Sequence, residues 1–101
     1  MKSRKVDQTE LNRWRALDAA DLLIKIADHV KKDSTFIPIK NSSTTRWHIS
    51  VNSRDQEILC TGARFWDTVQ KKGGGGAVDL VMYLFDVDFL AAVRILRSKG
   101  V

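Results

Sequence analysis

The residues best suited to chemistry lie in one segment, where cations stand beside aromatic side chains and a run of glycines. The segment contains Arg64, Phe65, Trp66, Lys71 and Lys72, followed by the consecutive glycines Gly73 to Gly76. Cationic side chains bind phosphate oxygens, and exposed aromatic rings stack on unpaired bases. Glycine lets backbone approach a phosphate, and a helix that begins after the run would add unpaired N–H groups. The segment therefore predicts a surface for an anionic partner.

A similar pair of side chains, Arg46 and Trp47, begins an earlier stretch in which apolar and polar residues alternate. Because side chains alternate across a strand, one of Phe65 and Trp66 should face the core and the other should face solvent. Together the two stretches predict a basic, aromatic sheet face that continues into the glycines. The predicted nucleic-acid-binding residues are Arg46, Trp47, Arg64, Trp66, Lys71, Lys72, Gly73, Gly74 and Gly75.

Metal ligation and catalysis have weaker support. A structural zinc site needs four ligands, commonly Cys and His in closely spaced pairs, whereas Cys60, His29 and His48 form no such pair. Cys60 lies in an apolar stretch, which is typical of a small buried side chain. Three aspartates between residues 79 and 88 fit helix first turns and caps better than a magnesium cluster. No Gly-Lys-Ser/Thr follows the glycines, so they are not a Walker loop. The sequence predicts no metal, no cofactor and no catalytic residue.

Length and charge restrict the class of protein. With 101 residues the chain can bury one modest core, which favours a small binding module over an enzyme with a large cavity. Its formal net charge of +5 favours an anionic partner such as nucleic acid. A single cysteine excludes an internal disulfide, and no apolar run reaches about 20 residues, the length of a membrane span. We expect a cytoplasmic protein with a flexible basic N-terminus at residues 1–6 and one domain at residues 7–101.

Hydrophobic periodicity predicts two helices in the N-terminal third. The first should begin at Asp7 and carry apolar side chains at Leu11 and Trp14. The second should begin at Asp18, with His29 near its C-terminal end. Its apolar stripe would comprise Leu22, Leu23, Ile26, Ala27 and Val30.

From Phe36 the period changes to that of strands. Residues 36–39 predict a short edge strand, because Pro38 cannot donate to a ladder. Residues 47–51 alternate as a half-buried strand, and residues 57–61 and 64–67 follow as further strands. The middle of the chain should therefore form an antiparallel sheet of three or four strands.

The glycine run interrupts this periodicity, so no regular element should pass through it. A helix after the run should direct inward Val78, Val81, Met82 and Phe85. A final helix, capped by Asp88 and ended by Gly100, should bury Phe89, Ala92, Val93 and Leu96. The expected fold is α+β: a small antiparallel sheet, zinc-ribbon-like but without metal, flanked by N-terminal helices and two C-terminal helices.

The order of residues 47–51, 64–67, 73–82 and 88–96 resembles a known family. It is similar to the zinc-binding domain that begins bacterial and phage DNA primases, and more closely to the degenerate versions in primase-like proteins of plasmids and integrative mobile elements. Those domains place a small antiparallel sheet before a glycine-rich turn, a short helix and a closing Phe-x-x-Ala-Val-x-x-Leu helix. The closing pattern is formed here by Phe89, Ala92, Val93 and Leu96. The likeness covers residues 17–98.

The chain departs from this family at the metal motifs. Where intact members have a Cys-x-x-His pair and a Cys-x-x-Cys pair, this chain has Ile-Pro-Ile-Lys at residues 37–40 and Phe-Trp-Asp at residues 65–67. The resemblance therefore implies no zinc here. It implies contact with a template strand and association with a primase catalytic domain or a replicative helicase. The polymerising centre of primases lies in a separate domain.

These observations lead to one principal hypothesis and two alternatives. The principal hypothesis is a metal-free, non-catalytic module of a mobile element that binds single-stranded DNA beside a primase or replication protein. The first alternative is a protein-interaction module that recruits a replication or conjugation partner through the exposed aromatic and the glycine run. The second is a regulator that binds duplex DNA through Arg94, Arg97 and Lys99 of the last helix.

Overall fold

The computed structural model describes residues 6–101, which form four helices and five strands. The elements are, in chain order, α1 (Gln8–Arg15), α2 (Ala19–Ile26), β1 (His29–Lys32), β2 (Thr45–Val51), β3 (Arg54–Thr61), β4 (Arg64–Asp67), β5 (Lys72–Gly75), α3 (Ala77–Phe85) and α4 (Phe89–Ser98). The fold is α+β, as expected, and its sheet has five strands rather than three or four. Of the expected flexible N-terminus, residues 1–5 lie outside the described residues, and Val6 packs against the core.

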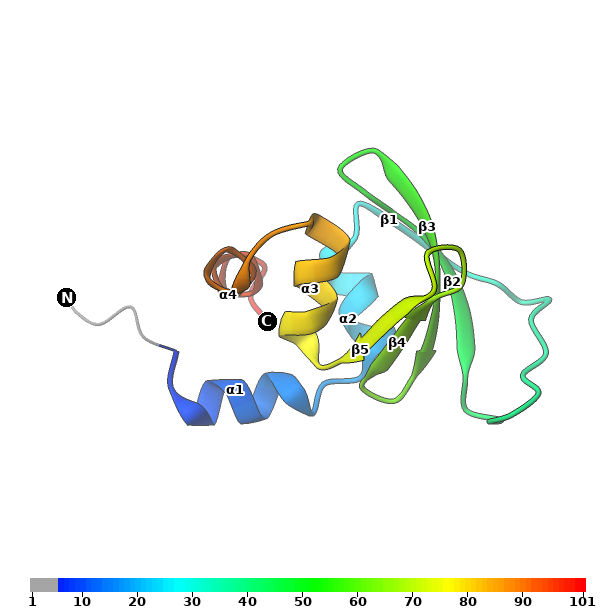
Figure 1. Ribbon diagram of the computed structural model, residues 1–101, viewed down its shortest axis with the longest axis horizontal. Helices are drawn as coiled ribbons and strands as arrows, with labels where there is room; N and C mark the ends of the chain where they lie inside the picture. The colour runs from blue at the N-terminus through cyan, green and yellow to red at the C-terminus, as the bar shows by residue number, and fades with distance from the viewer. Residues whose placement is uncertain (1–5) are drawn as a thin grey trace.

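The strands follow one another across a single sheet in the order β1-β2-β3-β4-β5, and each pair of neighbours is antiparallel. All four helices lie on one side of this sheet, and the long connection between β1 and β2 lies on the other side (Figure 1). We call the side toward the helices the inner face, which carries Ile49, Ile58 and Phe65. The opposite side is the outer face, which carries Arg46 and Trp66. No described helix is long and apolar enough to cross a membrane.

Aspartate caps begin three of the helices. Asp7 accepts a hydrogen bond from the amide of Glu10, and Asp18 and Asp88 likewise accept from the amide three residues on. Each carboxylate satisfies an amide that has no partner inside the helix, and its charge interacts favourably with the helix dipole. The helix starts predicted at these three positions are confirmed.

The predicted end of the second helix is wrong. The helix stops at Ile26 because Ala27 leaves the helical region, with φ −78° and ψ 150°. His29 and Val30 then belong to β1, where they pair with Ser50 and Ile49 of β2. Val30 suits a helix stripe and the inner face of a strand alike, and the ladder offered by β2 selects the strand.

Two predictions about the sheet are also wrong. Residues 36–39 form no strand but lie in the connection between β1 and β2, consistent with the missing donor at Pro38. Conversely, a regular element does pass through the glycine run, because Lys72–Gly75 forms the edge strand β5 and pairs with β4. Pairing with a neighbour offsets the weak intrinsic preference of glycine for strands.

The core lies between the inner face and the helices. In α4 the expected residues Ala92, Val93 and Leu96 are buried, but Phe89 remains 41% exposed. In α3, Val81 of the expected face is fully buried, and Val78, Met82 and Phe85 are partly buried against the core. The helix packs against β5, α4 and the first two helices, so several of its sides are apolar and the pattern does not single out one. The buried residues of α3 are Ala77, Leu80, Val81 and Leu84.

Candidate nucleic-acid interface

The strand register brings together predicted contacts from three strands, β2, β4 and β5, on the outer face. Cross-strand partners lie on the same side of a sheet, so Arg46, Leu59, Trp66 and Gly73 form one row across β2, β3, β4 and β5. A neighbouring row contains Thr61, Arg64 and Gly75. The outer face therefore combines two arginines with one tryptophan next to a strand that has few side chains.

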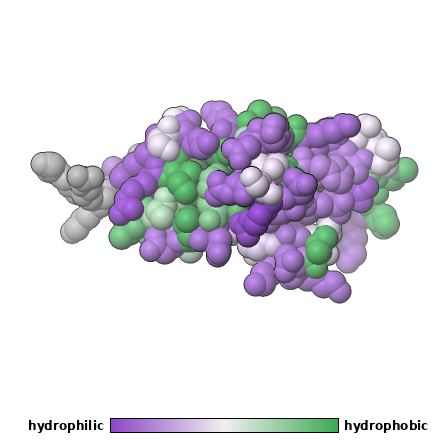
Figure 2. Space-filling model, turned by 90° about the horizontal axis from the view of Figure 1, so that it is seen from above, coloured by the Kyte–Doolittle hydropathy of each residue, from purple (hydrophilic) through white to green (hydrophobic). Residues whose placement is uncertain are grey.

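A groove of about 1020 Å³ crosses this part of the outer face. Its floor is built by Leu59, Thr61, Arg64, Trp66 and the strand β5, and its wall by residues 36–41 of the long connection. Ile37 and Ile39 in that wall are 80% and 96% exposed. Figure 2 shows apolar surface at the end of the molecule where this connection lies, next to hydrophilic surface. The groove thus has an apolar wall and a partly basic floor.

Trp66 provides the exposed aromatic side chain of the groove. It is 45% exposed, whereas its neighbour Phe65 is 5% exposed and packs against Tyr83 on the inner face. The prediction that one of the two would face solvent is confirmed. Trp66 also borders a second, shallower depression of about 550 Å³ that is lined by Lys71, Lys72 and Met82. The indole therefore stands between two hollows.

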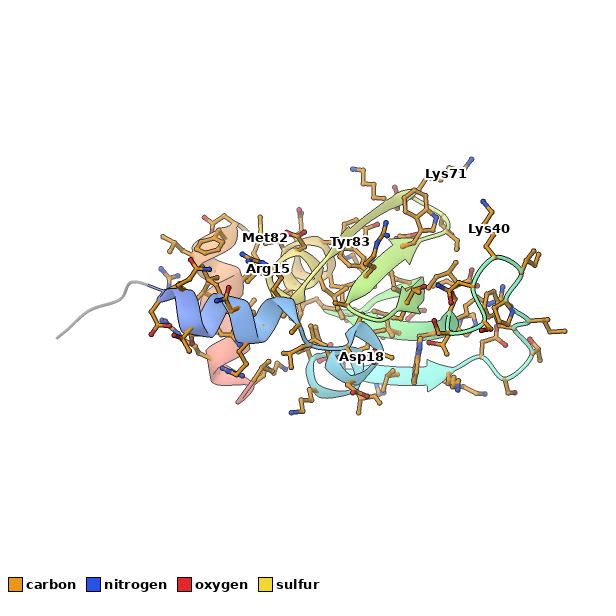
Figure 3. The ribbon with its side chains drawn as sticks, turned by 90° about the horizontal axis from the view of Figure 1, so that it is seen from below. Arg15, Asp18, Lys40, Lys71, Met82 and Tyr83 are labelled. Carbon is orange, nitrogen blue, oxygen red and sulfur yellow. The ribbon has the colours of Figure 1, made fainter. Side chains whose placement is uncertain are left out.

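Four cationic side chains line the groove and the depression, and none of them forms an ion pair among residues 6–101. They are Lys40, Arg64, Lys71 and Lys72. Lys40 extends from the connection and Lys71 from the β4–β5 turn toward the same side of the molecule (Figure 3). Free cations near an exposed ring are the two components that single-strand binding requires. Lys40 was not among the predicted contacts.

Arg46 has a different role from the predicted one. Its guanidinium lies 2.8 Å from the Asp33 carboxylate and 4.9 Å from the centroid of the Phe36 ring. His48 Nε2 lies 3.0 Å from the same carboxylate. Hydrogen bonds from Thr35, His48 and Arg46 hold the pKa of Asp33 well below its ordinary value. Arg46 therefore fastens the groove wall to the sheet, and its charge is largely neutralised.

Trp47 lies apart from the groove, contrary to its predicted role. It is cross-strand partner to the fully buried Ile58 on the inner face, and its indole N–H donates to Thr45 Oγ1 at 2.8 Å. A shift of one residue along a strand reverses the face, which separates Trp47 from Arg46. Of the cations proposed on α4, Arg97 is paired with Glu10 at 2.7 Å.

A buried carboxylate holds the turn that carries Lys71. Asp67 is 2% exposed and accepts hydrogen bonds from the amides of Val69 and Gln70 and from the Tyr83 hydroxyl. Burial raises the pKa of Asp67, but these hydrogen bonds outweigh burial and lower it below the ordinary value. Burial, with Asp67 beside it, raises the pKa of Tyr83 to about 12. The network ties the β4–β5 turn to α3.

Metal-binding and thiol chemistry find little support in the described structure. Among residues 6–101, no group of three or more His, Cys, Asp and Glu side chains could hold a metal ion. Cys60 is 2% exposed, and burial, with Asp18 nearby, raises the pKa of its thiol to about 12. The thiol is therefore protonated and inaccessible at neutral pH, which confirms its interpretation as a small buried side chain.

The wall of the groove is the part of the site that sequence reasoning missed. Its signal was present in residues 36–40, where apolar residues flank a proline and precede a lysine. A proline breaks a strand pattern, and large apolar residues in a loop often mark a contact surface.

Comparison of the chain with protein-family models, curated proteins and solved structures found no match.

Proposed function

We propose that the protein is a non-catalytic module that binds single-stranded nucleic acid, in the first place DNA, on the outer face of its sheet. The observation that carries this proposal is the exposed Trp66 between two hollows bordered by cations without ion-pair partners in the described residues. Phosphates would contact Arg64, Lys71 and Lys40, and an unpaired base would stack on the indole. Stacking of one base on an aromatic ring contributes about 1–3 kcal/mol.

Charge reversal at the β4–β5 turn tests this proposal. Fluorescence anisotropy with a labelled oligothymidylate should show affinity that falls with salt, and Lys71→Glu/Lys72→Glu should weaken binding at least about tenfold. Each lost phosphate contact should also reduce the slope of log affinity against log salt by about 0.7. Arg94→Glu/Lys99→Glu, which makes the same change in net charge on α4 and at its C-cap, is the matched control and should have a much smaller effect.

Three results would contradict the proposal. They are an absence of binding by the wild-type protein, an affinity that does not depend on salt, and an equal loss of binding in the two double variants. The last result would indicate a response to net charge rather than a site. Competition with duplex DNA separates the proposed module from a duplex-binding regulator, because duplex should compete poorly if the indole must contact an unpaired base.

A protein partner is the second candidate, and the exposed Ile37 and Ile39 favour it. Aliphatic side chains do not stack on bases as rings do, but they fill apolar pockets of a partner protein. If this surface recruits a replication or conjugation protein, Ile37→Ser/Ile39→Ser should abolish partner capture from a lysate treated with nuclease. The same double variant should leave oligothymidylate binding intact. Association with a primase or a replicative helicase stays a prediction from the resemblance.

A further inference from the structure

Gly73 has no room for a side chain, and the obstruction comes from the backbone of β4 together with the proposed stacking residue, Trp66. A Cβ built on Gly73 would lie 2.7 Å from Cε3 of Trp66 and 2.5 Å from the backbone oxygen of Phe65. Both separations are shorter than contacts that Cβ atoms make in proteins. The indole of Trp66 therefore lies against the α-carbon of its cross-strand partner in β5.

The other glycines of β5 are less constrained on the outer face. A Cβ on Gly75 would meet only Cγ of Arg64, at 3.7 Å, which is ordinary van der Waals contact. A Cβ on Gly74 would point to the inner face, toward Asp79 and Phe65. The need for glycine created by Trp66 is therefore specific to position 73.

We propose that Gly73 is a positioning residue, which lets the Trp66 indole lie against β5 so that the remaining surface of the ring is presented to a nucleobase. The inference rests on the proposed function and gives the glycine a role other than close approach of backbone to phosphate. An aromatic ring that covers a glycine on a neighbouring strand is a recognised device for fixing both. The ring loses solvent contact on one side, and Trp66 remains 45% exposed for stacking.

A fixed ring matters because stacking requires a flat surface in a defined orientation. A rotating side chain would lose conformational entropy on binding, whereas a seated ring has already lost it. A methyl group at position 73 would meet both the indole and the Phe65 backbone oxygen, so it would displace the ring or move β5 away from β4. Either change removes this advantage. Lys71 and Arg64 would keep their charges, so phosphate contacts would persist. The proposal therefore predicts a selective loss of the contribution that bases make to affinity.

The experiment compares Gly73→Ala with Gly75→Ala on two probes, an oligothymidylate and an abasic strand of equal length. In the wild-type protein the base-containing strand should bind about tenfold more tightly than the abasic strand and quench Trp66 fluorescence. Gly73→Ala should remove most of this difference and the quenching, while the salt dependence of binding persists. Gly75→Ala should reduce the difference much less. Trp66→Phe shows whether the quenching comes from Trp66, because the other two tryptophans, Trp14 and Trp47, still fluoresce in that variant.

A measurement on the wild-type protein keeps the proposal testable if Gly73→Ala does not fold. The α-protons of Gly73 should show an upfield ring-current shift in NMR spectra, and Trp66→Leu should remove it. Oligothymidylate should perturb the Trp66 indole N–H while that shift persists. The proposal would be overturned if the Gly73 α-protons had ordinary chemical shifts, or if the upfield shift disappeared when oligothymidylate binds. So would an unchanged base-dependent affinity in Gly73→Ala. If the wild-type protein binds neither strand, the proposed function itself fails.

Discussion

The two faces of the sheet show how one strand can place one side chain in the core and the next at the surface. In β4, Phe65 points inward and is 5% exposed, while the next residue, Trp66, points outward and is 45% exposed. In β3, Ile58 and Cys60 are buried on the inner face, and Leu59 between them lines the groove on the outer face. Alternation thus separates the side chains that hold the fold from those available to a partner.

Two arginines of the outer face differ in the same way, since one is held by contacts within the protein and the other is available to a partner. Arg46 is paired with Asp33 and stacked on Phe36, whereas Arg64 has no ion pair among the described residues. Proximity of a cation to an aromatic residue in the sequence therefore does not identify a ligand contact. A charge is available for binding only where the fold leaves it without a carboxylate.

The largest expected effect compares Phe65→Ala with Trp66→Ala. Loss of the buried ring should reduce the free energy of unfolding by about 3–5 kcal/mol, because the cavity forms in a packed core. Loss of the Trp66 ring should cost less, because 45% of its surface is already exposed to solvent. Urea denaturation monitored by circular dichroism measures both. If the two variants lost the same free energy of unfolding, the inner face would not contribute more to stability than the outer face, and the comparison would fail.

The second prediction concerns the buried carboxylate of the inner face. Asp67→Ala should destabilise the protein by about 2–3 kcal/mol, since the amides of Val69 and Gln70 and the Tyr83 hydroxyl lose their shared acceptor. Asp55→Ala, at an exposed position in β3, is the control and should change stability by no more than about 0.5 kcal/mol. Chemical denaturation under the same conditions compares them. Equal effects would show that the hydrogen bonds of Asp67 contribute little.

Titration of the only tyrosine tests the same cluster through pH. Tyr83 should ionise near pH 12 in the native protein, and near its ordinary value of about 10 in denaturant. Because the folded pKa is raised, the contribution of Tyr83 to stability is complete below about pH 10. It is lost as pH rises toward 12. Ultraviolet absorbance of the tyrosinate follows the titration directly. A native pKa near 10 would contradict the buried hydrogen bond to Asp67.

The smallest expected effect concerns the two arginines of the outer face. Arg64→Ala should weaken oligothymidylate binding by about 1 kcal/mol and reduce its salt dependence. Arg46→Ala should leave the salt slope almost unchanged, because the charge of Arg46 is already paired with Asp33. Anisotropy titrations at several salt concentrations distinguish the two variants. A larger change of slope in Arg46→Ala would reverse the assignment.

Local signals predicted much of the fold. Caps at Asp7, Asp18 and Asp88 begin three helices as expected, and the strands at β2, β3 and β4 follow the observed alternation. Local signals failed where a segment suits more than one structure. Val30 fits either a helix or a strand, and a glycine run has no periodicity, so neighbouring strands decided both.

The candidate site was less predictable than the fold. Arg64 and Lys71 were predicted from their position near aromatic residues and glycines. Alternation predicted that one of Phe65 and Trp66 faces solvent, and the structure shows that it is Trp66. Lys40 and the apolar wall at residues 36–41 approach the groove only through the long β1–β2 connection, which the Arg46 and Asp33 pair fastens to the sheet. Contacts of this kind depend on partners distant in the sequence.

The sequence by itself determined the fold class, three helix starts and the alternation that exposes one of Phe65 and Trp66, because each depends on neighbouring residues and their periodicity. Only the tertiary structure decided which cations remain unpaired, which strand borders the glycines and why position 73 must lack a side chain. Those properties arise where separate strands meet, and there the close approach of β4, through the Phe65 backbone and the Trp66 ring, leaves Gly73 no room for a side chain.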